Sequence, residues 1–152
     1  DSKTDDYTIF NQGGKIELNN VTYNSTINKA FQMAGGGDVV LTDCNISGDV
    51  TGTYSASNIW CGDGRNVTVN GGTYGSIFMN AQYHSGWPAA SAHAASKITL
   101  NDGTITKLTL ETELGAEGYY VSATLTQNGG TITNLVENPQ NLDLTGRSQY
   151  NK

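Results

Sequence analysis

The longest interruption of an otherwise regular chain, residues 80–96, carries the side chains best suited to bind a ligand. It contains Tyr83, His84, Trp87 and His93. Tyrosine and tryptophan rings can stack on the apolar face of a sugar or anchor a protein contact, and loops on rigid scaffolds often carry binding residues. The sequence therefore predicts a binding loop for a cell-surface glycan or a protein receptor.

Two alternatives for this loop stay open from the sequence. Trp87 and Pro88 could pack the loop against the side of the fold, with the alanine-rich residues 89–95 forming a short helix. His84 and His93 could ligate a metal, but no cysteine or carboxylate stands beside them at ligand spacing. No metal is predicted.

The acidic residues do not form a recognisable catalytic set. Glu111, Glu113 and Glu117 share one excursion and are expected to form an exposed acidic turn, although a carboxylate pair would suit acid–base chemistry on a glycoside. Asp38 and Asp63 lack the alternating oxygen ligands of a calcium loop, so weak calcium binding is only the alternative to solvated turns. We predict no catalytic residue and no cofactor.

The two cysteines, Cys44 and Cys61, fall in the same repeat. Cys44 takes the position that Gly72 and Gly103 hold in later repeats, so two small core thiols are expected. A disulfide, or a redox or metal role, is the alternative.

These residues are positioned by a sequence repeat with five copies. Residues 97–108 read K-I-T-L-N-D-G-T-I-T-K-L, residues 66–77 and 124–135 are near-copies, and weaker copies begin at Lys15 and Asp38. Successive copies start 23 to 31 residues apart. Such a period indicates a repeat architecture.

Apolar residues alternate within each copy, as in a strand with one buried face. The four predicted inward columns are Ile16, Val39, Val67, Ile98 and Leu125; Leu18, Leu41, Val69, Leu100 and Gln127; Tyr23, Ile46, Tyr74, Ile105 and Ile132; and Ile27, Val50, Ile77, Leu108 and Leu135. The predicted outward columns are Glu17, Val40, Thr68, Thr99 and Thr126, and Thr22, Asn45, Thr73, Thr104 and Thr131.

A polar corner separates the first two strands of each copy. Its first position holds Asn19, Asn70, Asn101 and Asn128, with Thr42 as the exception. Asparagine and glycine tolerate the left-handed backbone of a sharp bend. Stacked from copy to copy, the asparagines are expected to form a structural amide ladder.

Short strands separated by bends at this period predict an all-β fold, a right-handed parallel β-solenoid of about five coils. A third, less regular strand is expected at residues 31–33, 58–60 and 119–121. The expected organisation is an N-terminal cap or linker at residues 1–14, the solenoid at 15–138, and a C-terminal edge strand or tail at 139–152.

The N-G-G-T-[YI]-x-x-[IL] signature at residues 70–77 and 128–135, with a variant at 101–108, resembles right-handed parallel β-helices of the pectin-lyase-like kind. In particular it is similar to the repeats of Gram-positive bacterial surface proteins and phage tail-spike or fibre proteins. The resemblance implies an extracellular, cell-surface or virion location, and a homotrimer or larger fibre assembly.

Composition excludes some partners. The net charge is −6, and no basic run is present, which disfavours nucleic-acid binding. No segment has the length of apolar sequence that spans a membrane, so no membrane insertion is expected.

Three functions follow as hypotheses. The first is a non-enzymatic attachment or structural module. The second is a polysaccharide lyase or hydrolase, which the outward threonine columns disfavour because the family's enzymes place acids there. The third is ice binding through those same columns, for which ordinary cross-strand pairing of β-branched residues is the structural alternative.

Overall fold

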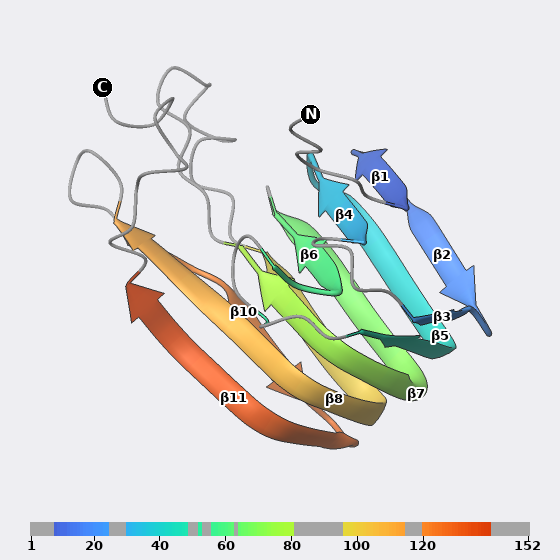
Figure 1. Cartoon of the computed structure of the whole chain (residues 1–152). Helices are drawn as coiled ribbons and strands as arrows, with labels where there is room; N and C mark the ends of the chain where they lie inside the picture. Colours follow the sequence, from blue (N-terminus) through green and yellow to red (C-terminus); the bar gives the residue numbers. More distant parts are fainter. Residues whose placement is uncertain are drawn as a thin grey trace, which may run out of the picture.

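In a computed structural model, all regular structure consists of β-strands, and no helix occurs among the residues described (Figure 1). The structure describes residues 8–24, 30–48, 52, 56–62, 64–80, 96–114 and 120–140. The strands are β1 (Ile9–Gln12), β2 (Ile16–Asn19), β3 (Thr22–Asn24), β4 (Phe31–Ala34), β5 (Gly37–Ser47), β6 (Ile59–Cys61), β7 (Arg65–Met79), β8 (Lys97–Leu114), β9 (Tyr120–Ser122), β10 (Thr124–Gln127) and β11 (Thr131–Gln140).

The chain winds around a common axis and forms three parallel faces. The long strands β5, β7 and β8 bend at the corners, so each contributes to more than one face. The first face stacks Ile16, Val39, Val67, Ile98 and Leu125. The second face stacks Tyr23, Ile46, Tyr74, Ile105 and Ile132. The third face stacks Ile9, Phe31, Ile59, Ile77, Leu108 and Leu135.

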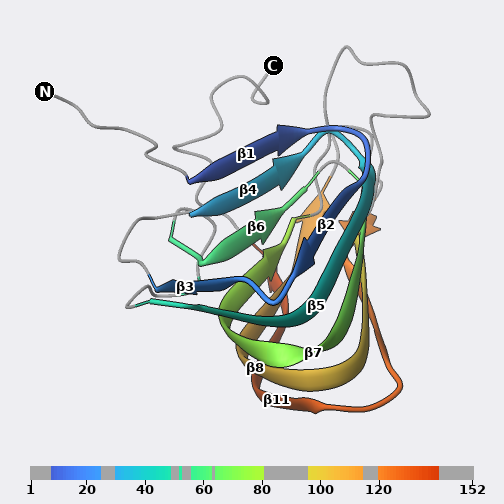
Figure 2. The same cartoon turned by 90° about the vertical axis from the view of Figure 1, so that its right-hand side faces the viewer.

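The predicted parallel β-solenoid is therefore confirmed, but the described residues form about three full turns, fewer than the five coils expected. Seen from the β1–β2 end, the chain passes clockwise from the third face to the first and then the second while it recedes, so the winding is right-handed (Figure 2). The turns that begin at Val39, Val67 and Ile98 have a neighbouring turn on both sides. Within the described chain, the turns that begin at Ile16 and Leu125 lie toward the two ends.

The prediction of a fourth column was wrong in part. Ile77 pairs with Leu108, as expected, but its partner on the other side is Ile59, not Val50. In the first two turns, residues 25–30 and 48–58 intervene between the second and third faces, so counting from the corner misplaces the third face. In the next two turns the second and third faces are continuous in β7 and β8, and the excursions come after the third face.

The expected third strands at residues 31–33 and 58–60 correspond to β4 and β6. The prediction that a third strand at residues 119–121 belongs to the parallel stack was wrong. β9 instead pairs antiparallel with the end of β8, through Thr112 and Ser122. A hairpin of this kind adds local pairing to an excursion without adding a rung.

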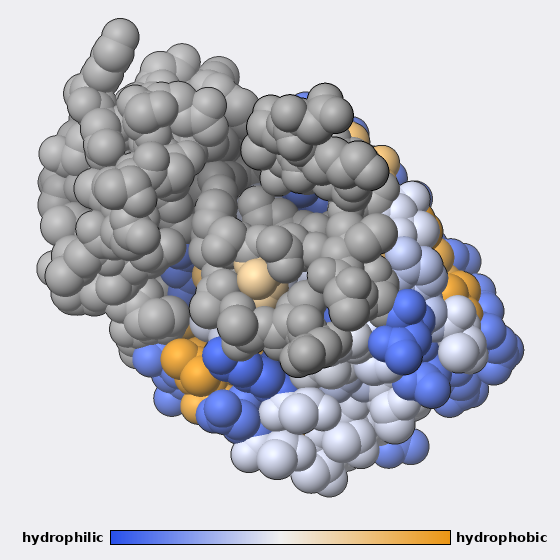
Figure 3. Space-filling view, in the orientation of Figure 1, coloured by the Kyte–Doolittle hydropathy of each residue, from blue (hydrophilic) through white to orange (hydrophobic). Residues whose placement is uncertain are grey.

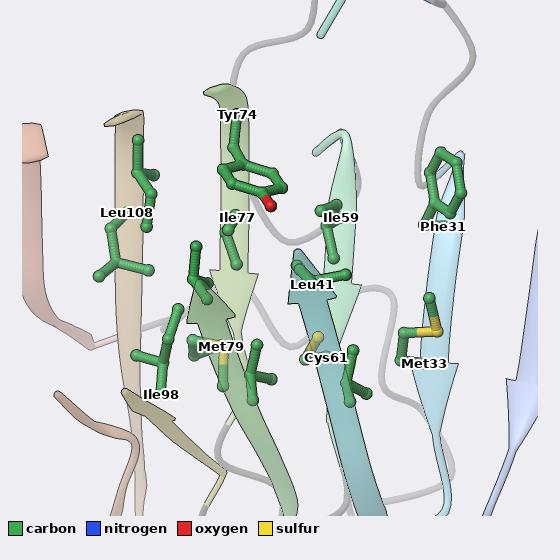
Figure 4. Packing of buried hydrophobic residues seen from close by; sticks show 14 of the residues in the cluster. Phe31, Met33, Leu41, Ile59, Cys61, Tyr74, Ile77, Met79, Ile98 and Leu108 are labelled. Carbon is green, nitrogen blue, oxygen red and sulfur yellow. The ribbon is translucent and has the colours of Figure 1, made fainter. Parts of the chain in front are cut away.

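The interior is one continuous apolar core that runs through all the described turns. In the close-up of Figure 4, Ile59, Ile77 and Leu108 of the third face point into the same interior as Leu41 and Ile98 of the first. Full burial of such a side chain stabilises the fold by roughly 1.5–3 kcal/mol. Apolar contacts in this core thus hold the three faces together.

One aromatic hydroxyl lies inside this core. The Tyr74 hydroxyl donates a hydrogen bond of 3.0 Å to the Gly71 carbonyl, which satisfies it at the corner. Burial raises the pKa of the Tyr74 phenol well above its usual range. Tyr74 therefore acts as a neutral core residue.

The corners have the left-handed backbone that the polar residues there predicted. Asn20 and Asp43 have φ values of 54° and 50°, and Gly72 in a later turn has 92°. A Cβ at Gly72 would come within 2.2 Å of the Cys44 carbonyl oxygen. Glycine is required there both by conformation and by the close approach of the preceding turn.

The segments expected to flank the solenoid carry strand as well. β1 lies within residues 1–14 and pairs parallel with β4, which adds one rung to the third face. β11 continues to Gln140, opposite Thr112. Residues 141–152 of the expected edge strand or tail lie outside the described residues.

Candidate binding surface

The residues predicted to bind a ligand, Tyr83, His84, Trp87 and His93, lie outside the described residues. The structure does describe the two stems of their loop. Asn80 and Ser96 are fully buried at the corner between the third and first faces. The Asn80 amide donates to the Cys61 carbonyl at 2.7 Å, and the Ser96 carbonyl accepts from the Thr124 amide at 3.1 Å. The loop therefore leaves and re-enters the fold at buried, hydrogen-bonded positions.

The buried base of this loop also holds a carboxylate. Glu111 is fully buried, and the Asn80 side-chain amide donates a hydrogen bond to its carboxylate. The expectation that Glu111 belongs to an exposed acidic turn was therefore wrong. Glu113 lies on β8 opposite Val121, and Glu117 is outside the described residues. Of the three acids, the structure gives surroundings for Glu111 alone.

Three of the four corner asparagines are brought together. The side-chain amide of Asn101 donates to the side-chain oxygen of Asn70 at 2.8 Å, and that of Asn128 donates to Asn101 at 2.8 Å. Asn19 is separated from Asn70 by Thr42, which pairs with both on the first face. The hydrogen bonds thus run through three successive turns, all in the same direction.

The outer surface of the first face is mixed in charge. Its outward column is Glu17, Val40, Thr68, Thr99 and Thr126, in register from turn to turn. Lys15 lies 2.6 Å from Glu17, and Asn66 donates to Asp38 at 3.2 Å in the neighbouring outward column. Glu17, the acid of this outward column, therefore forms an ion pair with Lys15 at one end of the stack.

The outer surface of the third face is apolar and covered. Trp60 and Phe78, which point outward on adjacent turns, are only 3% exposed and cluster with Ala34. Thr109, next in this column, donates to the Gly52 carbonyl at 3.2 Å. Phe10, at the β1 end, is 44% exposed.

The outer surface of the second face is polar and uncharged. We call its outward positions the neutral strip. They are Thr22, Asn45, Thr73, Thr104 and Thr131 in one column, and Asn24, Ser47, Gly75, Thr106 and Thr133 in the next. Seven of these residues are exposed, and Ser47, Gly75 and Thr104 are half-buried. In the space-filling view, orange is confined to small patches, among them patches over the β11 end and the β1–β2 end, and the lower surface is mainly white and blue (Figure 3).

Side-chain contacts order part of the neutral strip. The Thr73 hydroxyl donates to the Asn45 side-chain oxygen at 2.9 Å, along the column. At Gly75 the strip is covered by Asn58, whose side-chain oxygen accepts from the Ser76 amide at 2.8 Å. A Cβ at Gly75 would come within 2.3 Å of that oxygen.

Arg65 is a buried residue that sequence reasoning missed. It is fully buried, and its guanidinium donates to the Gly14 carbonyl at 2.6 Å, to the Asn11 carbonyl at 3.2 Å and to the Ala34 carbonyl. The available signal was its position two residues before Val67, which places it on the inward side of the strand. It joins the first corner to later turns and has a structural role.

Both cysteines are free and fully buried, as core thiols were expected to be. The Cys44 thiol donates to the Leu18 carbonyl at 3.3 Å. Burial raises the pKa of the Cys61 thiol to about 12, and the nearby Arg65 charge opposes this only in part. Cys61 is therefore a neutral thiol at physiological pH.

Comparison of the chain with protein-family models, curated proteins and solved structures gives no match. Among the described residues, no three histidine, cysteine, aspartate or glutamate side chains are grouped to hold a metal ion. In the same part of the chain, no helix is long and apolar enough to cross a membrane. Any function must therefore be argued from the surfaces themselves.

Proposed function

We propose that this chain is a non-enzymatic attachment or structural module, part of a bacterial surface protein or a phage fibre. Its β-solenoid would present binding surfaces on a rigid support. The observation that carries the proposal is the parallel ladder, which keeps its register on all three faces apart from shifts at the Asn70 corner and near the end of β11. One core runs through every described turn while outward side chains repeat in columns. Parallel stacking keeps such columns straight, which suits an extended contact surface.

The repeat signature supports the same proposal. The N-G-G-T signature at residues 70–77 and 128–135 resembles pectin-lyase-like β-helices of bacterial surface proteins and phage fibres. Attachment proteins of this kind act outside the cell or on a virion, which fits an acidic chain with a net charge of −6. On this proposal the partner is a cell-surface glycan or protein receptor, and a trimer or longer fibre is the expected assembly.

A polysaccharide lyase or hydrolase is the alternative. Enzymes that this repeat resembles place clustered acids with arginine or lysine on one parallel face. Here the corresponding first-face column holds Thr68, Thr99 and Thr126, and its acid, Glu17, is paired with Lys15. Glu111 is fully buried and accepts a hydrogen bond from the Asn80 side-chain amide. These positions favour binding over bond cleavage.

The test is binding of the labelled chain to Gram-positive cells and to a glycan array, together with an assay for released oligosaccharides. We expect binding without release. Trp87→Ala and Tyr83→Ala test the predicted loop, with Thr126→Ala on the first face as a matched surface control. Release of oligosaccharides from pectin, alginate or host glycans would make the enzyme the correct assignment. Absence of binding to every cell and glycan would overturn attachment.

A further inference from the structure

The three outer faces differ in chemistry, and among the described residues only the second face has outward positions that are both largely exposed and uncharged. The third face is apolar and covered at Trp60 and Phe78, and the first carries Glu17 and Asp38 among its exposed outward residues. The ten positions of the neutral strip contain no charged side chain, in a chain of net charge −6. The absence of charge from a single exposed face singles out the second face.

The neutral strip has a regular geometry. Parallel register places successive outward residues about 4.8 Å apart along the axis, and residues two apart on one strand about 6.6 Å apart. Thr73, Thr104 and Thr131 follow one another in register. Threonine is β-branched and stiff at its first side-chain torsion, so its hydroxyl is held in place before any ligand arrives. The strip is therefore a pre-ordered row of hydroxyl donors and acceptors.

Amide groups widen this row on the side of the corner. Asn101 and Asn128 are exposed and linked by the corner hydrogen bond of 2.8 Å. Asn45, within the strip, accepts from Thr73 through its side-chain oxygen, which orients its amide group. A mixed hydroxyl and amide surface matches the hydroxyl groups of sugars, which both donate and accept hydrogen bonds.

Charged residues stand at both borders of the strip. Asp43 and Asp102 are exposed at the corner beside it, and Lys107, which follows Thr106, is half-buried at the opposite border. Two carboxylates next to the row repel an anionic chain, such as one built of uronic acids, and leave an uncharged chain unaffected. The asparagine side chains in and beside the strip, together with Gly75, which has no side chain, interrupt the all-threonine lattice that ice binding would need.

We propose that the neutral strip binds an extended, uncharged polysaccharide that lies along the stacking axis. This inference rests on the proposed attachment function and names its ligand class. A single exposed hydrogen bond contributes little, so the binding must be shared across several turns. Affinity therefore rises with the number of sugar rings until the chain spans the strip.

The test compares two triple variants that remove hydroxyl groups without changing side-chain shape. Thr73→Val, Thr104→Val and Thr131→Val together alter the neutral strip, and Thr68→Val, Thr99→Val and Thr126→Val alter the first face as a matched control. Affinity electrophoresis uses soluble glucan, mannan and galactan against alginate and polygalacturonate, with urea unfolding to show that both variants remain folded. We expect the wild type to bind an uncharged polysaccharide. The strip variant should lose at least about tenfold in affinity, equal to about 1.4 kcal/mol, and the control should keep it.

Other results overturn the proposal in distinguishable ways. If the strip variant binds an uncharged polysaccharide as well as the wild type does and Trp87→Ala abolishes binding, attachment stands and the site is the loop. If the wild type binds only the acidic polysaccharides, the ligand class is wrong. Thermal hysteresis that the strip variant loses, without polysaccharide binding, would make ice the ligand. Absence of binding to any polysaccharide, array glycan or cell would remove the inference and the attachment function together.

Discussion

The buried guanidinium of Arg65 donates hydrogen bonds to backbone carbonyl groups of the first turns, as water does for exposed carbonyls. It donates to Asn11 and Gly14, which belong to the turn that contains β1, and to Ala34 on β4 in the next turn. A hydrogen bond to a charged group contributes about 1.5–3 kcal/mol, and a buried carbonyl left unpaired costs a similar amount. This one side chain thus ties the β1–β2 end of the stack to its middle.

Arg65→Met should lower the free energy of unfolding by about 3 kcal/mol, because methionine fills the space but donates nothing. Urea unfolding followed by circular dichroism measures it. Lys97→Met, an exposed change at the start of β8, is the control and should cost less than about 0.5 kcal/mol. Equal stability of the two variants would contradict the role given to Arg65.

The buried Cys61 thiol makes the free energy of unfolding depend on pH in the alkaline range. Its pKa is about 12 in the folded protein and about 8.5 in an unfolded chain. The folded state therefore holds the proton more tightly, and this contribution is complete below pH 8.5 and lost as pH rises toward 12. The loss approaches about 1.4 kcal/mol per pH unit between those values.

Cys61→Ala should consequently show a shallower fall in unfolding free energy between pH 8.5 and 10.5 than the wild type. Its stability at pH 7 will be lower because a buried side chain is truncated, so the slopes are the quantity to compare. Tyr74 titrates in both proteins and cancels from the comparison. Identical slopes would show that the Cys61 thiol ionises as readily in the folded chain as in the unfolded one.

At the scale of the element, the corner asparagines test whether stacked side chains stabilise neighbouring turns. Asn101 takes part in two side-chain hydrogen bonds, and Asn128 in one. Asn101→Ala should therefore cost about 1–2 kcal/mol and Asn128→Ala about half as much, as measured by urea unfolding. Equal costs, or a larger cost at Asn128, would mean that the backbone bend matters and the amide row does not.

Alternation within each strand made the first and second faces predictable. Val67, Ile98 and Tyr74 point inward as expected, because the two-residue period is a local property of extended chain. The third face was harder, since residues 48–58 intervene in one turn and residues 81–95 come after the face in another. Where an excursion enters a turn depends on how the turns pack, which no single repeat encodes.

Burial of polar and charged groups was also beyond the sequence. Glu111 and Arg65 look like solvated residues beside turns, yet both are fully buried. Their burial depends on partners distant in sequence, Asn80 for Glu111 and Gly14 for Arg65. The predicted ligand residues of the loop, including Trp87, lie outside the described part of the chain and stay a prediction.

At the scale of the whole molecule, stability is a sum of contacts between adjacent turns. The middle strands β7 and β8 have neighbours on both sides along their first, second and third faces. Among the described residues, β10 and β11 pair on one side only, and Leu135 is 41% exposed. The attachment proposal and the neutral strip both require that this stack be parallel and in register.

Methyl and amide nuclear Overhauser contacts test that requirement most directly. In the folded chain, the methyl groups of Ile98 should show contacts with both Val67 and Leu125, and β7 and β8 should show the cross-strand pattern of parallel pairing. Contacts between Ile98 and only one of these residues, or an antiparallel pattern between β7 and β8, would contradict the solenoid and with it the straight columns on which binding is argued.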